Sequence, residues 1–326
     1  MLNLKVDTEK NGTQPVLNVA KNILIKSETL IILLVMVIIL SILSPTFLHP
    51  QNLINVVRQI SVIAIIAMGS TMAIITTGID LSPGSVVALV GVVTATYAHS
   101  DSQLLLAILI GLFTGAFAGF INGSISALGK IPPFIATLGM YTAARGAALI
   151  FSDGRPVTDL SHGFEFIGGG YILGIPCPIY IMIVTGVLVH ILLKHTKFGK
   201  HVYAIGGNTQ AAVVSGINVE RTLIYVYSLA GLLAGLGGII LTSRLDAGQP
   251  TSGVGYELDA IASAVIGGTS LSGGIGTIGG TMIGALIIGV LNNGLDLLNV
   301  SPYWQQILKG VIIVGAVLLD KIKNKK

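Results

Sequence analysis

Apolar stretches follow one another along almost the whole chain, separated by short polar or Gly- and Pro-rich segments. The first includes "LIILLVMVIILSIL", and most approach the roughly 20 residues that a helix needs to cross a bilayer. The pattern predicts about ten spans, at residues 28–45, 60–77, 83–99, 103–128, 133–151, 178–194, 222–242, 256–270, 276–297 and 302–320. The sequence therefore predicts an all-α polytopic membrane protein.

One break in this pattern carries a charge. In "GIDLSPGS", two glycines loosen the helix and Pro83 cannot continue one from upstream. Asp80 and Ser82 are residue types that cap helix N-termini, so the stretch predicts a broken helix with a new half-helix after it. Two interpretations stay open: Asp80 caps a helix at the cytoplasmic interface, or its carboxylate gates or lines a polar path through the bundle.

Further polar residues fall inside or at the edges of the predicted spans: Asn122, Arg145, Asp259, Asn292, Asn293, Asp296 and Lys309. Hydrogen bonds between helices, or lysine snorkelling, account for most of them. Arg145 lies in the middle of a span and is the hardest to explain in this way. Amide and hydroxyl groups with few fixed charges also suit a path for a sugar.

Composition agrees with a membrane protein. Only 10% of the 326 residues are charged, against about 25% in an average soluble domain. Glycine accounts for 42 residues, and small residues let helices approach closely in lipid. The net charge of +4 does not indicate nucleic acid, because the cations form no basic surface interleaved with aromatic residues.

The distribution of Lys and Arg predicts the topology. Most of the 18 fall in the N-terminal tail (1–27), the 129–132 turn, the 194–221 loop and the basic tail (321–326). The positive-inside rule then places these segments and both termini in the cytoplasm. It leaves 153–177 and 243–255 outside and 28–320 as the membrane domain.

Several kinds of site are disfavoured. Cys177 is the only cysteine, and His190, His195 and His201 beside one span read as interfacial residues rather than metal ligands. The match to G-x-G-x-x-G in "GGIGTIGG" lies between membrane spans and not after a strand, so it does not indicate dinucleotide binding. No G-x-x-x-x-G-K-[ST] motif occurs, and no nucleophile has a base and an orienting group.

A weak internal repeat links the two halves of the chain. "GIDLSPGSV" (78–86) resembles "GTSLSGGIG" (268–276), and "IPPFIATL" (131–138) resembles "SPYWQQIL" (301–308). Transporters often contain such repeats, with broken helices at matching positions. Chance similarity between Gly-rich apolar segments is the alternative, and the sequence does not distinguish a parallel from an inverted repeat.

The 194–221 loop contains a predicted short helix. "NTQAAVVSG" follows a "GG" turn, Asn208 is a plausible N-cap, and "GIN" ends the element. A short helix between glycine hinges at the cytoplasmic face would suit docking of a partner.

These motifs carry a family resemblance. "YAIGGNTQAAVVSGIN", "GIDLSPGSVVAL", "GQPTSGVGYELDAIASAVIGGTSLSGG" and "LNNGLDLL" resemble the ribose-type permease family of bacterial ABC importers, from about residue 28 to the C-terminus. Pro83 stands where relatives often have valine, which puts helix geometry carried over from them in doubt.

The resemblance implies a pore formed by two copies of the permease in the inner membrane. A cytoplasmic ABC ATPase binds ATP and Mg²⁺, and a periplasmic or lipid-anchored binding protein delivers the sugar. This chain then needs no cofactor and is not itself an enzyme. The family's ATPase-coupling element corresponds to Gly206, Gly207, Asn208, Ala211, Ala212 and Gly216.

Alternatives remain at this point. Galactose, xylose or another sugar-like molecule stays open as the solute of such an importer, because a separate protein selects the ligand. An ion-coupled secondary transporter would need a carboxylate relay, which Asp80, Asp259 and Asp296 would have to supply. A membrane scaffold without transport is disfavoured by the interrupted helices.

Overall fold

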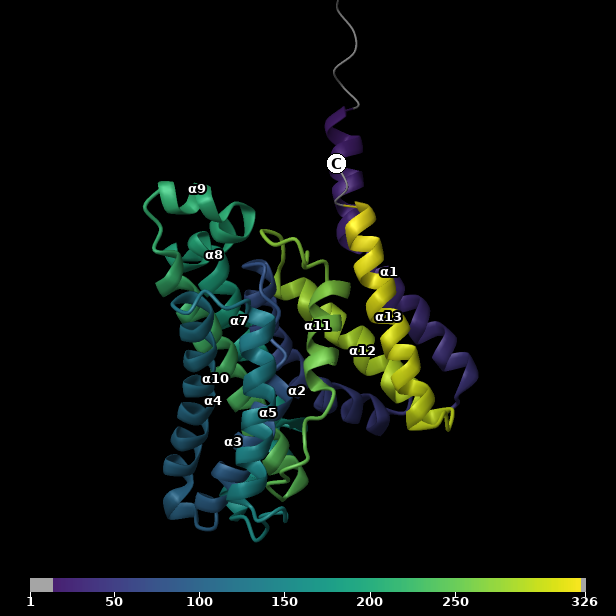
Figure 1. Ribbon diagram of the computed structural model, residues 1–326. Helices are drawn as coiled ribbons and strands as arrows, with labels where there is room; N and C mark the ends of the chain where they lie inside the picture. The colour runs from purple at the N-terminus through teal and green to yellow at the C-terminus, as the bar shows by residue number, and fades with distance from the viewer. Residues whose placement is uncertain (1–13, 324–326) are drawn as a thin grey trace, which may run out of the picture.

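A computed structural model describes residues 14–323, and most of that range is helical (Figure 1). The α-helices are α1 (Gln14–Leu43), α2 (Pro50–Ile75), α3 (Pro83–Tyr97), α4 (Leu104–Ala127), α5 (Pro133–Phe151), α6 (His162–Gly169), α7 (Cys177–His195), α8 (Lys197–Gly207), α9 (Thr209–Val214), α10 (Val219–Leu245), α11 (Tyr256–Ile266), α12 (Ile278–Leu297) and α13 (Pro302–Lys323). A 3-10 helix, η1 (Asp101–Gln103), precedes α4. Strands β1 (Tyr171–Ile172) and β2 (Ile175–Pro176) form an antiparallel hairpin.

Each predicted span coincides with a helix, but their lengths differ. Within residues 14–323, six helical stretches are long and apolar enough to cross a membrane: Pro50–Ile75, Asp101–Ala127, Pro133–Phe151, Cys177–His195, Val219–Leu245 and Ile278–Leu297. Two apolar stretches, Thr29–Leu43 and Pro83–Tyr97, are shorter. The all-α polytopic architecture is therefore supported, and the number of ten spans stays a prediction.

Two helices begin earlier than the predicted spans that they contain. The N-terminal tail was expected to extend to residue 27; α1 begins at Gln14, but its apolar stretch begins at Thr29, so the tail boundary stays a prediction, and residues 1–13 lie outside the described range. The second span was expected from residue 60, whereas α2 begins at Pro50, because its first turns are polar and do not register as apolar. Of the predicted C-terminal tail, residues 324–326 also lie outside the described range.

Helix α2 forms the centre of the bundle. From Ile60 to Ile75 its side chains are buried, and it packs against α7, α10, α11 and α12. These contacts surround the helix on all sides with protein. The sequence of this part of α2 has no polar face, and a helix that is apolar on all sides is expected to be buried in this way.

The most extensive helix pair is α4 with α10, and glycine makes the approach possible. A Cβ built on Gly115 would lie 2.8 Å from Cα of Gly235 in α10. Gly231 faces Gly119 in the same way, with a Cβ 2.8 Å from its Cα. Small residues four apart on facing helices let the backbones come into contact, as in other membrane bundles.

The connecting segments gather at two opposite ends. At one, here called the α9 end, α8 and α9 lie near the segments that follow α2 and α11 (Figure 1). At the other, called the hairpin end, a β-bridge joins Val157 to Gly248 beside the β1–β2 hairpin. The predicted separation of 194–221 from 153–177 agrees with this arrangement, and which end faces the cytoplasm stays a prediction.

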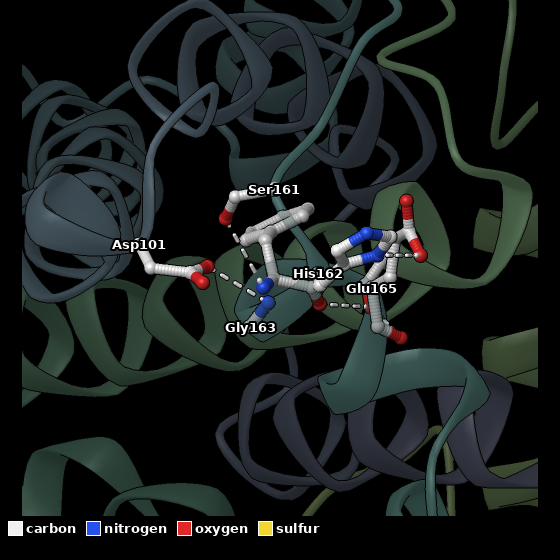
Figure 2. Close-up of polar contacts among 7 residues, drawn as sticks. Asp101, Ser161, His162, Gly163 and Glu165 are labelled. Carbon is white, nitrogen blue, oxygen red and sulfur yellow. Dashed lines mark hydrogen bonds and ion pairs between the residues drawn. The ribbon is translucent and has the colours of Figure 1, made fainter.

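Side-chain hydrogen bonds organise the hairpin end. The carboxylate of Asp101 accepts a hydrogen bond from the amide of Gly163 at 2.8 Å, at the N-terminus of α6 (Figure 2). The amide of Ser161 donates to Ala98 at 2.8 Å, and the Ser161 hydroxyl caps α6 at Phe164. The α3–α4 connection is thereby held against α6.

Candidate functional site

Two helices, α3 and α11, begin inside the bundle. They have 15 and 11 residues, fewer than the roughly 20 needed to cross a bilayer. A Cβ on Gly84 would overlap the carboxylate of Glu257, so the two N-termini lie against each other. Both therefore direct the positive ends of their dipoles toward one buried region. The predicted half-helix after residue 82 is confirmed, and α11 adds a second one.

The polar cluster beside α3 brings three predicted residues together. Asp80 is 3% exposed, and its Oδ1 accepts hydrogen bonds from the amide and the hydroxyl of Ser82, at 2.8 and 2.7 Å. Asn122 of α4 donates to the same hydroxyl at 2.9 Å. The Oδ1 atom of Asn122 is buried without a hydrogen-bond partner among the described residues.

The simple capping role expected of Asp80 is wrong. The N-cap of α3 is Ser82, and its side chain makes no capping hydrogen bond. Asp80 bonds instead to the residue two positions ahead, which fixes the turn that leads into the helix. Pro83 at the first helical position has no amide of its own, and the amide of Ser85 in the first turn donates to the backbone carbonyl of Ser82 at 3.1 Å instead of to a side chain.

Arg145 clamps the segment before α11. Its guanidinium donates to the carbonyl oxygens of Pro250 at 2.6 Å and Ser252 at 2.9 Å, with a longer contact of 3.5 Å to Gly84. The side chain therefore satisfies backbone groups of an irregular segment, which a membrane interior requires. It also connects α5 to the point where α3 and α11 meet.

Two buried polar residues at this centre were missed. Glu257 is 7% exposed, and its Oε2 has no hydrogen-bond partner among the described residues. The hydroxyl of Tyr227 is likewise buried and unpartnered in the described range, beside Gly78. The sequence could have indicated Glu257, because it is a charged residue in an apolar stretch, two residues before Asp259. No sequence pattern singles out Tyr227.

Asp259 of α11 and Asp296 of α12 lie apart from this centre. Asp259 is 4% exposed and pairs with Lys309 of α13 at 3.0 Å. Asp296 accepts a hydrogen bond from Gln305 at 2.8 Å, in an exposed position. Each therefore joins α13 to a neighbouring helix rather than lining a common site with Asp80.

The two predicted asparagines of α12 have different surroundings. Asn293 exchanges two hydrogen bonds of 2.9 Å with Asn52 at the start of α2, a partner that was not predicted. Asn292 is half-buried, and its Oδ1 has no hydrogen-bond partner among the described residues. The predicted path residues thus occupy separate places along the bundle.

The short helix predicted in the 194–221 loop is confirmed as α9. The side chain of Asn208 caps it by accepting a hydrogen bond from the amide of Ala211 at 2.9 Å, and Gly216 follows it with φ of 81°. Ala212 is buried at 3% exposure, whereas Val213 and Val214 are 57% and 89% exposed. The helix therefore presents an apolar tip at the α9 end.

The two glycines before α9 are not a flexible turn, as the sequence suggested, but the last residues of α8. A Cβ on Gly206 would overlap the carbonyl oxygen of Ile75 in α2. A Cβ on Gly207 would have no described atom within 4 Å. The position that requires glycine for close packing is therefore Gly206.

Comparison with known proteins identifies the family. Residues 52–317 match the family described as "Branched-chain amino acid transport system / permease component". The chain is 52% identical to the ribose import permease protein of Bacillus subtilis (strain 168) over 294 residues, which are 90% of this chain and 91% of that relative. It belongs to the ribose-type permease family.

Other relatives are named for the import of ribose or of other sugars. It is 49% identical to the ribose import permease protein of Escherichia coli (strain K12), over 93% of this chain and 95% of the relative. Identity to the galactose/methyl galactoside import permease protein of the same strain is 40%, over 90% and 93%. No solved structure matches the chain. The permease is a multi-pass membrane protein, and its apolar helices agree with that.

Proposed function

We propose that the permease is the membrane-spanning subunit of an ATP-driven, binding-protein-dependent importer of ribose. The relatives named for ribose import are 47–52% identical, whereas those named for D-allose and galactose are 40% identical. Near-uniform coverage of both chains makes this difference meaningful. Ribose is therefore preferred over D-allose and galactose as the solute.

The subunit works with partners in this proposal. Two copies form the pore in the bacterial inner membrane, with both termini in the cytoplasm. A separate ABC ATPase binds ATP and Mg²⁺ and docks at the α9 end, and a periplasmic or lipid-anchored binding protein delivers ribose at the hairpin end. The exposed apolar tip of α9, at Val213 and Val214, is the observation that carries the docking assignment. An isolated apolar projection beside the membrane suits a partner's groove.

In this proposal the half-helices α3 and α11 take part in transport at the buried polar centre, where their N-termini meet. The N-termini of α3 and α11 meet beside Glu257, and Arg145 holds the segment between them and the hairpin end. We place Asp80, Ser82, Asn122 and Arg145 in the part of the path that rearranges. Asp259 and Asn293 contribute through contacts between helices, and Asn292, whose Oδ1 has no hydrogen-bond partner among the described residues, keeps its predicted place along the path.

Reconstitution tests the proposal. Vesicles containing the permease with its cognate ATPase should accumulate radiolabelled ribose when the binding protein is on one side and ATP on the other. Omission of either partner should abolish accumulation, and collapse of ion gradients should leave it unchanged. Unlabelled ribose should compete more strongly than galactose or xylose.

The outcomes separate the parts of the claim. Accumulation driven by a proton gradient without ATP would favour an ion-coupled secondary transporter and contradict the ABC assignment. ATP-driven uptake of another sugar would contradict only the assignment of ribose.

A further inference from the structure

Three segments that are far apart in the sequence meet at the α9 end. They are the last turn of α2, the last turn of α8, and the glycine turn 273–276 between α11 and α12. The amide of Gly274 donates to the carbonyl oxygen of Ile75 at 2.9 Å. Gly206 of α8 lies against the same pair of atoms, since a Cβ there would overlap Ile75 and come within 2.5 Å of the Gly274 nitrogen.

The contact is made by backbone atoms and leaves no room for side chains. A Cβ on Gly273 would overlap Cγ2 of Thr77 and lie 2.7 Å from the carbonyl oxygen of Gly206. A Cβ on Gly274 would lie 3.1 Å from Cα of Gly207. Gly273 and Gly274 also have φ of 84° and 72°, which glycine adopts readily. A displacement of one segment must therefore displace the others.

Tyr203 adds a directional bond to this contact. Its hydroxyl, one turn before Gly206 on α8, donates to the carbonyl oxygen of Gly276 at 2.7 Å. A tyrosine phenol is protonated at neutral pH, and burial raises the pKa of Tyr203 further, so the hydroxyl is available as a donor. The bond fixes α8 to the far side of the glycine turn, immediately before α12.

The junction is connected directly to α9. The amide of Asn208 donates to Ala204 of α8 at 3.0 Å, while the side chain of Asn208 caps α9. The hydroxyl of Thr209 donates back to Ile205 at 3.0 Å. Because two hydrogen bonds and a cap span the corner, α8 and α9 move as one unit.

The end of α2 is strained and has space beside it. Thr77 has φ of 65°, a conformation that is costly for a β-branched residue. Thr76 and Thr77 line a cavity of about 270 Å³ that also touches Ile205 and Thr209. A shift of α8 can therefore move the α2–α3 break without first unpacking a filled core.

We propose that this junction transmits the movement of α9 to the breaks before α3 and before α12, and that Gly206 and Tyr203 are its positioning residues. The proposal rests on the docking of an ATPase at α9. It identifies which backbone contacts connect the docking loop to α2, on which the bundle is centred, and to the α11–α12 connection.

The test uses the complete complex in vesicles and measures two quantities, ATP hydrolysis and ribose uptake. Gly206→Ala should retain the ATPase on co-purification yet reduce ribose moved per ATP by about tenfold or more, since an overpacked contact costs enough to shift an equilibrium that far. Tyr203→Phe, which preserves shape, should reduce the same ratio by about three- to tenfold through loss of one hydrogen bond. Gly279→Ala in α12 is the matched control, because a Cβ there would have no described atom within 4 Å and the residue lies outside the coupling element, and it should behave as wild type.

The two variants and the control make the outcome decisive. Equal ratios for Gly206→Ala and Gly279→Ala, or an unchanged ratio for Tyr203→Phe, would contradict the junction. If Gly206→Ala does not fold, Tyr203→Phe alone decides. A wild-type complex that moves no ribose would instead overturn the proposed function, and the junction with it.

Discussion

The two ends of the permease are held together by different chemistry. At the α9 end, α2, α8 and the 273–276 turn meet through backbone atoms and glycines. At the hairpin end, exposed side chains add to backbone contacts such as the Val157–Gly248 bridge: Asp101 binds the amide of Gly163, and His99 contacts the carbonyl oxygen of Asp159 at 2.9 Å. Side chains can adapt by changing rotamer, whereas closely packed backbone segments cannot.

This difference separates two mechanical roles. A junction closed mainly by backbone atoms has few ways to relax, so it passes displacement onward instead of absorbing it. An end joined by exposed side-chain hydrogen bonds tolerates substitutions and small changes of geometry. The α9 end is therefore suited to transmitting movement, and the hairpin end to receiving a soluble partner.

The orientation of the two ends gives the largest expected effect, since labelling is all or none. In a Cys177→Ser background, an impermeant thiol reagent applied to intact cells should label Thr158→Cys at the hairpin end. It should label Thr209→Cys only after the membrane is permeabilised. Thr158 suits a labelling site because its side chain is exposed and makes only one long hydrogen bond, to Asp159 at 3.4 Å. Ser161 suits it less well, because its hydroxyl caps α6 and a substitution would remove the cap. Labelling with the opposite pattern would reverse the assignment of the cytoplasmic face.

A glycine substitution at each end tests the contrast in packing. Gly273 and Gly174 have similar φ angles, 84° and 78°. A Cβ added to Gly273 would overlap a neighbour, whereas a Cβ added to Gly174, in the hairpin turn, would have no described atom within 4 Å. Gly174→Ala should cost about 1–2 kcal/mol from the left-handed conformation alone. Gly273→Ala should cost about 1–3 kcal/mol more from overpacking. Thermal unfolding in detergent measures both, and equal losses would remove the claimed difference between the ends.

How much of this was visible in the sequence depends on the range of the interaction. The α9 helix and its Asn208 cap were predicted because both lie within a few residues. Helix positions followed from hydropathy for the same reason. The Asn52–Asn293 pair was not predicted, because its partners are 241 residues apart and no local pattern connects them.

The glycines show the limit most clearly. Gly206 and Gly207 are adjacent and equivalent in the sequence, yet only Gly206 faces α2. Which face of α8 meets the bundle depends on the tertiary packing. Similarly, Asp80 is a residue type that caps helices, but the helix starts three residues later with Ser82 at the N-cap position, so the Asp80 carboxylate bonds to Ser82 instead.

Asp80 tests whether the α9 end also depends on buried side-chain bonds. Asp80→Ala leaves the amide and hydroxyl of Ser82 without their acceptor, which should cost about 1–3 kcal/mol per buried group that stays unpaired. Asp80→Asn keeps an oxygen in the same place and should cost much less. Unfolding and ribose uptake are measured on both. If Asp80→Asn inserts correctly but loses uptake, the charge itself is required and a purely structural role is wrong.

The smallest effect is expected at the hairpin end, from Asp101. Its carboxylate lies at the N-terminus of α6 and accepts the Gly163 amide (Figure 2), but the side chain is exposed, so water replaces the lost partner. Asp101→Ala should therefore lower the unfolding temperature less than Asp80→Ala, while amide exchange at Gly163 becomes faster. Asp101→Asn, which retains an acceptor, should restore slow exchange, and His162→Ala is a control for the exposed neighbour that contacts Glu165. A loss of stability as large as that of Asp80→Ala would mean that the hairpin end is as intolerant of change as the α9 end, and the proposed division between them would be wrong.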